Sequence, residues 1–420
     1  MRNRLASIDK IYIWACIIVA SNFFGLYQKI APITQIYFTD MIAMTLLALS
    51  LGYLFIHLSN LKLVLYKKLN TKSLMQSFLF IIIIEIMLGI LRYGAKQSIM
   101  MTIKEAFVPL SMVAIFFSWE IILKHKGIEY IINTLIKVSI VCSVFAIIAY
   151  ILLDKTGNNF FNLDVNNYSF YRYNKPHFMI GSMIVVPAMI FAWVNQLEGC
   201  KEKYNIIAVV LNLIHIIVIG KTRTLITFII ITLVIIYIYT TKKTKKFKLC
   251  VTFVCVVLFA IIEGSTIVTS IAVLFADNSV TFRINAINYY MNQIKSYPLF
   301  GMGFIGQGNN LLQTLLYGPK MQYYRTDVGF IGFINEYGLV GGTWFILLII
   351  YAYKKLKLAV KKIGKNKIVT YAASFLFFLV ISSINLFAID GFRLVYLPLL
   401  MSLISYIEYS IKYDYIEKDN

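Results

Sequence analysis

Arginine residues in this 420-residue chain gather beside long apolar stretches, where their chemistry suits the binding of an anion. Six of them lie on segments otherwise poor in basic residues: Arg92, Arg172, Arg223, Arg283, Arg325 and Arg393. The guanidinium donates hydrogen bonds in a planar fork that fits a phosphate group, which lysine cannot do. Snorkelling to lipid headgroups explains any single arginine equally well. The six arginines together favour an anionic ligand that binds where these segments meet.

Three carboxylates stand beside these arginines or inside the apolar stretches. Asp327 follows Arg325 by two residues, where it could accept a proton from a sugar hydroxyl or serve as a helix N-cap, and the sequence favours neither. Glu336 would lie opposite Asp327 on an unbroken helix, which indicates a different role. Glu85 lies inside an apolar stretch, so we expect it to form an ion pair with an arginine or lysine on the side of the protein that carries the six arginines.

A short amphipathic helix is predicted between two apolar stretches. Its apolar residues recur at helical spacing, at Ile284, Ile287, Met291 and Ile294. Ser279 or Thr281 could cap this helix, and Pro298 cannot continue it. Arg283 would then sit in its first turn. Such a helix can lie flat on a membrane surface, or it can pack over the mouth of a helix bundle with its arginine in solvent.

A glycine-rich segment follows this helix and contains Gly301, Gly303, Gly306 and Gly308. Glycine allows backbone N–H groups to approach an anion closely. The spacing alone is a weak signal, and a dinucleotide-binding interpretation fails because no predicted strand precedes the segment.

Two further motifs place cations between apolar stretches. Lys221 and Arg223 lie in a connection with almost no loop, so both must be at the membrane surface, where a lipid-linked phosphate would be. Arg172 belongs to a Tyr- and Asn-rich segment that ends at His177. The histidines are too scattered for a zinc site, and no nucleophile elbow supports Ser-His-Asp hydrolysis.

The composition assigns these motifs to a membrane protein. Hydrophobic residues make up 60% of the chain and charged residues 14%, and the mean hydropathy is +0.76. These values exclude a soluble enzyme, a nucleic-acid binder and a disordered chain. The net charge of +21 is therefore interpreted as a topology signal. The five cysteines show no metal-ligand spacing, and we expect inert, reduced thiols.

Twelve apolar runs are long enough to be membrane spans, and the chain is predicted to be a single all-α membrane domain over 1–420. The runs are 11–28, 37–58, 74–91, 104–123, 130–152, 177–196, 204–219, 224–240, 249–270, 328–353, 368–388 and 394–411. Lysine is concentrated in alternate loops, which places both termini in the cytoplasm, and the first run lacks a signal-peptide cleavage site. Two outer loops result, 153–176 and the large 264–327.

The order of these motifs resembles the superfamily of bacterial O-antigen polymerases (Wzy) and O-antigen ligases (WaaL). Arg172 with Pro176–His177 resembles the family's Arg and Pro-Asn, with His in place of Asn, and Lys221–Leu225 resembles its Thr/Ser-Arg at the start of a span. Arg283 with Pro298–Gly303 resembles its Arg…Pro-Leu-x-Gly-x-Gly. Glu336–Gly341 resembles its Glu-x-Gly-Leu-x-Gly. Where ligases carry a His-Asn, this chain has Thr326–Gly329, which favours a polymerase.

The resemblance implies a glycosyltransferase of the bacterial cytoplasmic (inner) membrane that acts in lipopolysaccharide or related polysaccharide biosynthesis. It would join undecaprenyl-pyrophosphate-linked oligosaccharide repeat units into O-antigen at the outer face. The pyrophosphate already activates the donor, so neither a metal, a nucleotide nor another cofactor is expected. Membrane lipids, a chain-length regulator and a flippase are the implied partners, and nucleic acid is not.

The resemblance also implies residue roles. The catalytic residues would be Asp327, Arg283 and Arg223. Substrate would be bound by Arg172, His177, Lys221, Arg325, Gly301, Gly303 and Glu336. One alternative is a ligase that transfers glycan to the lipid A-core. Another is a flippase or transporter, which is disfavoured because the chain lacks two similar halves.

Overall fold

The computed structural model describes most of the chain. The described residues are 5–22, 25–27, 38–59, 69–123, 127–159, 171–172, 175–176, 181–200, 202–220, 222–240, 278–306, 309–387 and 389–414. The predicted run 249–270, His177 and Lys221 lie outside these ranges.

The described residues form helices almost throughout, which confirms the all-α prediction. The α-helices are α1 (Ser7–Ala20), α3 (Phe38–Ile56), α5 (Asn70–Tyr93), α6 (Ile99–Glu105), α7 (Phe107–Leu123), α8 (Gly127–Thr156), α9 (Ser182–Leu197), α10 (Lys203–Ile214), α11 (Arg223–Thr240), α13 (Asn278–Ser296), α14 (Asn310–Tyr317), α15 (Gly329–Lys362), α16 (Lys367–Ser382) and α17 (Tyr396–Tyr409). The π-helices η3 (His215–Gly220) and η5 (Ser410–Asp414), the 3-10 helix η4 (Arg325–Val328) and the two-residue strands β1 (Tyr171–Arg172) and β2 (Lys175–Pro176) complete the set.

Every predicted apolar run that falls in the described residues overlaps a helix. Within the described residues, five helices could cross a membrane by length and composition, or six if the bent pair α6–α7 is one span. Other apolar helices, among them α9, α11 and α16, are too short to meet this criterion. The number of twelve spans therefore stays a prediction. The break before α7 is consistent with Pro109, which lacks an N–H and is best accommodated in the first turn of a helix.

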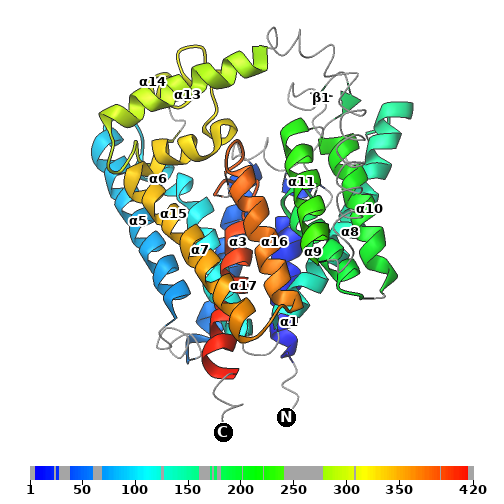
Figure 1. Cartoon of the computed structure of the whole chain (residues 1–420). Coiled ribbons are helices and arrows are strands. Elements are labelled where there is room, and N and C mark those ends of the chain that lie inside the picture. The colour runs from blue at the N-terminus through cyan, green and yellow to red at the C-terminus, as the bar shows by residue number, and fades with distance from the viewer. Residues whose placement is uncertain are drawn as a thin grey trace.

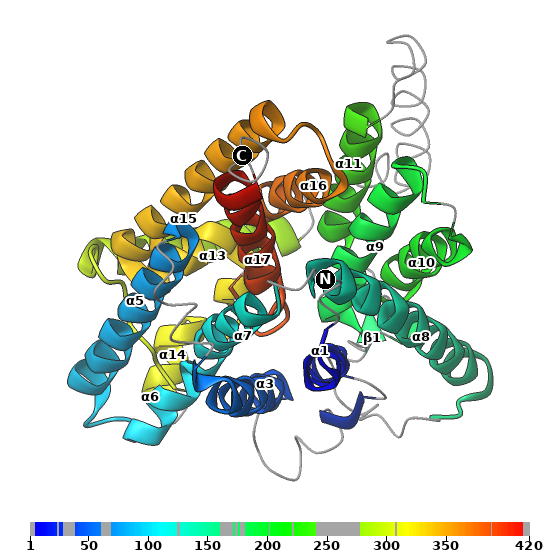
Figure 2. The same ribbon diagram turned by 90° about the horizontal axis from the view of Figure 1, so that it is seen from below.

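The long helices run side by side between two ends of the molecule (Figure 1). α1 begins and α17 ends at the lower end, while α13 lies across the upper end (Figure 1). Seen from below, α8–α11 gather on one side and α5, α6, α13, α14 and α15 on the other, with α16 and α17 between them (Figure 2). α16 packs against α9 and α11 on one side and against α15 and α17 on the other, and so joins the two groups.

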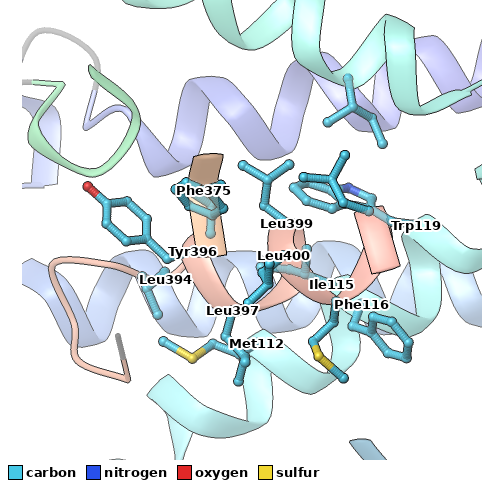
Figure 3. Close-up of a cluster of buried hydrophobic side chains, with 14 of the residues drawn as sticks. Met112, Ile115, Phe116, Trp119, Phe375, Leu394, Tyr396, Leu397, Leu399 and Leu400 are labelled. Carbon is cyan, nitrogen blue, oxygen red and sulfur yellow. The ribbon is translucent and has the colours of Figure 1, made fainter. Parts of the chain in front are cut away.

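The main apolar core lies around α17, which has buried residues on all sides. α7 contributes Trp119 and Phe116, α16 contributes Phe375, and each of these three side chains is fully buried. They surround Leu399 and Leu400 of α17 (Figure 3). This packing fixes the helices whose upper ends carry the candidate site.

Candidate functional site at the upper end

α13 is held over the upper end by its tyrosines. The Tyr290 hydroxyl donates to the Leu316 carbonyl at 2.8 Å, and the Tyr289 hydroxyl donates to the Thr314 carbonyl at 2.8 Å. Both acceptors lie in the last turn of α14, and the Thr314 carbonyl also accepts the N–H of Gly318. Burial raises the pKa of both phenols, so they remain neutral donors. Tyr290 and Ala286 also pack on Val328 of η4. α13 is therefore fastened to the segment that carries Asp327.

The predicted helix exists, but a different face of it is buried. Ile284 is 52% exposed and Met291 is 41% exposed, whereas Ala286 and Tyr290 are buried. Hydrogen bonds from polar side chains to α14 decide the orientation, which apolar spacing alone could not show. Arg283 lies on the inner face, because residues 283 and 290 are two helical turns apart.

Two details of the predicted start of this helix are wrong. Ser279 and Thr281 lie inside α13, which begins at Asn278, so neither of them caps it. Arg283 is consequently in the second turn and not the first. Its end is as predicted, because α13 stops at Ser296, before Pro298.

α15 is broken at Gly338, and the segment after α13 fills the break. Gly338 has φ 63° and ψ −169°, which is open to glycine and strained for other residues. Leu339 and Val340 donate their N–H groups to the carbonyls of Pro298 and Leu299 at 2.8 and 3.0 Å. Each donor that the break removes from the helix thus finds a partner.

The same segment binds the other side of the break. The Met302 N–H donates to the Asn335 carbonyl at 2.8 Å and the Gly303 N–H to the Glu336 carbonyl at 3.1 Å. A Cβ on Gly301 would lie 2.5 Å from the Glu336 carbonyl oxygen, so only glycine fits. These glycines allow the segment to approach α15 closely. The Gly303 N–H already donates to a carbonyl of the protein.

Four charged side chains meet at this break. Arg325 Nη1 lies 3.6 Å from Glu336 Oε2, and these side chains are 13% and 27% exposed. Glu85 of α5 lies within electrostatic reach of Glu336, Arg325 and Arg92. η4 and Gly329, whose φ is 53°, turn the chain before α15, and Glu336 therefore reaches back to Arg325. The expectation that Glu336 lies opposite Asp327 assumed an unbroken helix from 327 to 336, and that helix is not formed.

Several buried polar atoms of this cluster have no hydrogen-bond partner within the described part of the chain. They are Arg325 Nε and Nη2, both carboxylate oxygens of Glu85, and Asn335 Oδ1. The prediction that Glu85 forms an ion pair is not borne out among the described residues. A buried polar group without a partner costs about 1–3 kcal/mol, more if it is charged. Such atoms indicate where ligand atoms would be accepted.

Two of the six arginines, Arg92 and Arg393, are bonded to loop residues of the protein. Arg92 donates to the Gly301 carbonyl and stacks 4.6 Å from the centre of the Tyr297 ring. Arg393 forms an ion pair with Asp390 and donates to the Phe387 carbonyl at 2.9 Å. Burial raises the pKa of Asp390, and the adjacent guanidinium opposes that rise. These two arginines stabilise loops. The arginines that remain candidates for binding an anion are Arg172, Arg223, Arg283 and Arg325.

Arg283 and Asp327 lie on elements that pack together, α13 and η4. Arg283 is half-buried and has no hydrogen bond or ion pair to the described residues, while Asp327 is exposed. The N-cap residue of α15 is Val328, and no side chain caps that helix. The structure therefore gives no support to a capping role for Asp327 at α15.

For Arg172 and Arg223, the structure describes the position of the backbone. Arg172 pairs with Lys175 across the β1–β2 bridge, which lies at the upper end (Figure 1). Arg223 begins α11, whose other end meets the loop after α15, where the Lys365 ammonium bonds the Tyr239 carbonyl. Arg223 thus lies at the upper end as well. Its side chain, His177 and Lys221 are outside the description.

A polar network that the sequence analysis missed lies below Arg223. The buried Ser143 hydroxyl contacts His215 Nδ1 at 3.1 Å and donates to Asn212 Oδ1 at 2.8 Å. His215 opens the π-helix η3, which ends at Gly220 next to Lys221. A buried histidine within an apolar run was the available signal for this network.

The comparisons with known proteins agree with the placement of these motifs. The family described as "O-Antigen ligase" matches residues 207–346. The matched region includes α11, α13, η4 and the break in α15, and so contains Arg223, Arg283, Arg325 and Glu336. No curated protein matches the chain. The match does not distinguish polymerases from ligases. The match over this third of the chain supports its resemblance to the superfamily of O-antigen polymerases and ligases.

Proposed function

We propose that the protein polymerises undecaprenyl-pyrophosphate-linked oligosaccharide repeat units into a surface polysaccharide. The observation that carries this proposal is the cluster at the α15 break, where a paired carboxylate and a buried arginine with unused donors lie side by side. A reaction that creates an extra negative charge on a leaving pyrophosphate needs preorganised donors of this kind.

In this proposal, the donor pyrophosphate is bound by Arg283, Arg223, Arg172 and Arg325. Asp327, which is exposed on η4, binds the acceptor sugar hydroxyl as a base or as a positioner. The acceptor oxygen forms a bond to the anomeric carbon, the bond from that carbon to phosphate breaks, and undecaprenyl pyrophosphate leaves with the electron pair. Gly301, Gly303 and Glu336 shape the site, and His177 and Lys221 complete the substrate-binding set.

A polymerase is favoured over a ligase by the Thr326–Gly329 segment, where the ligases of the superfamily carry a His-Asn pair. We place the upper end at the outer face of the bacterial inner membrane and both termini in the cytoplasm. A chain-length regulator and a flippase are the expected partners.

Deletion of the gene tests the proposal against its alternatives. Surface glycan from a polymerase deletion strain should carry a single repeat unit. Loss of all repeat units would indicate a flippase, and loss of transfer to the lipid A-core would indicate a ligase. Restoration of long polymer by the intact gene is the control.

A further inference from the structure

The backbone of α15 is bonded to the segment after α13 at Glu336. Its carbonyl accepts the Gly303 N–H at 3.1 Å, and the residue before it accepts the Met302 N–H at 2.8 Å. Two residues later the helix breaks at Gly338. The carboxylate of Glu336 is 27% exposed and so remains accessible from the upper end. A side chain held in this way is preorganised for chemistry.

Arg325 uses only part of its guanidinium on Glu336. Nη1 lies 3.6 Å from the carboxylate, while Nε and Nη2 are buried without partners in the described structure. The guanidinium beside it favours the ionised form of Glu336. The unused donors can bind the oxygens of an anion at the same time, because a guanidinium offers five N–H groups in a fixed plane.

We propose that Glu336 is the base that accepts the proton of the acceptor hydroxyl, and that Arg325 is thereby released to bind the leaving pyrophosphate. This inference rests on the proposed function. The O–H proton moves to the Glu336 carboxylate as the oxygen attacks the anomeric carbon, and the carbon–phosphate oxygen bond breaks. Glu336 becomes neutral while the pyrophosphate gains one negative charge. Arg325 therefore exchanges one anionic partner for another, and the net charge around it is unchanged.

The structure favours Glu336 over Asp327 for this step. Asp327 is exposed at the surface of η4, where water competes for the acceptor and screens charge. Glu336 is partly shielded and shares its counter-ion with the leaving group. Asp327 is left with the task of orienting the acceptor hydroxyl. Glu85, buried beneath Gly303 with its Oε2 3.6 Å from where a Cβ would be, lies too deep to touch the acceptor.

Azide provides a test, because it is an anionic nucleophile that needs no base. The purified protein is given a lipid-linked repeat unit as donor, with either an acceptor repeat unit or sodium azide. Glu336→Gln should reduce transfer to the sugar hydroxyl about 10²- to 10⁴-fold, the usual contribution of a general base, and should leave glycosyl azide formation within about threefold of wild type. Arg325→Lys should reduce both reactions.

The control is Glu198→Gln at the lower end, where the carboxylate accepts a hydrogen bond from Thr370. It should leave both reactions unchanged. Equal loss of both reactions in Glu336→Gln, or full hydroxyl transfer, overturns the proposal. If wild type does not use azide, transfer to the sugar hydroxyl is compared between Glu336→Asp and Glu336→Gln. A higher rate in the Asp variant supports Glu336 as the base, and an equal loss of rate in both variants overturns it. Wild-type protein that transfers to neither acceptor contradicts the proposed function itself.

Discussion

Glu408 at the lower end of the molecule and the charge cluster at the upper end differ in how far their polar atoms are bonded within the protein. At the lower end, Glu408 accepts hydrogen bonds from the Thr71 hydroxyl at 2.6 Å and the Tyr351 hydroxyl at 2.6 Å, and it pairs with Lys355 at 3.0 Å. It also accepts the backbone N–H groups of Asn70 and Thr71 at the start of α5. Its carboxylate is fully used within the protein.

At the upper end, the charges are left partly open. Arg325 has two buried nitrogens without partners, and Glu85 has two such oxygens. Satisfied charges such as Glu408 join helices to one another, because their removal would leave the remaining partner uncompensated. The unused nitrogens of Arg325, on a side chain that is 13% exposed, indicate a place for a ligand. A partnerless atom alone does not, because Glu120 at the lower end also has a buried oxygen without a hydrogen bond to the described residues.

The largest expected effect concerns which side each end faces. α14 begins at the upper end and α15 ends at the lower end (Figure 1). A reporter enzyme that is active only outside the cytoplasm should therefore work when fused at Asn309 and fail when fused at Lys362. The reverse pattern would place the open charges in the cytoplasm, away from an outer-face polymerisation.

The second effect is on stability at the lower end. Glu408→Ala removes the acceptor that joins α5, α15 and α17, and breaking a buried pair in this way costs about 3–5 kcal/mol. We expect a lower thermal unfolding temperature in detergent or lipid, with the activity of each folded molecule retained. A variant of normal stability would show that this network is not structural.

The third effect is on activity at the upper end. Arg283→Lys and Arg223→Lys keep the charge but lose the fork, and the lost transition-state contact is worth roughly 2–4 kcal/mol, or about 30- to 1000-fold in rate. Polymer length at matched protein level is the measurement. Arg393→Lys is the matched control, because Arg393 is bound by Asp390 in a loop. Full polymer in the Arg283 and Arg223 variants would leave only headgroup anchoring.

The smallest effect concerns Asp327. If Asp327 orients the acceptor while Glu336 takes the proton, Asp327→Asn should reduce the rate no more than about tenfold, the value of one hydrogen bond. Asp327→Ala should reduce it further. A loss of 10²-fold or more in the Asn variant would make Asp327 the base and remove that role from Glu336.

The sequence predicted the helices well and the connections between them less well. Apolar runs of about 20 residues identify helices because the pattern is local, and α5, α8 and α15 were all found in this way. The break at Gly338, in contrast, depends on distant partners. Pro298 and Leu299 supply the carbonyls for Leu339 and Val340, and spacing within α15 carries no trace of this.

For the site, residue types were more informative than their geometry. The preference for arginine over lysine pointed to the upper end, but it could not separate Arg393, which stabilises a loop, from Arg325, which keeps open donors. The roles of Gln293 and Asn335 were missed. Asn335 donates to Gln293 Oε1 at 2.8 Å and so links the α15 break to α13, a contact between residues far apart in the sequence.

Reconstitution tests the central claim most directly. Purified protein in lipid vesicles would be given undecaprenyl-pyrophosphate-linked repeat units as the only substrate, and the products would be separated by size. We predict a ladder of polymers with release of one undecaprenyl pyrophosphate for each bond formed, and its loss in Arg325→Lys but not in Arg393→Lys. Unreacted repeat units with correctly folded wild-type protein, or an equal ladder in the two variants, would contradict the account.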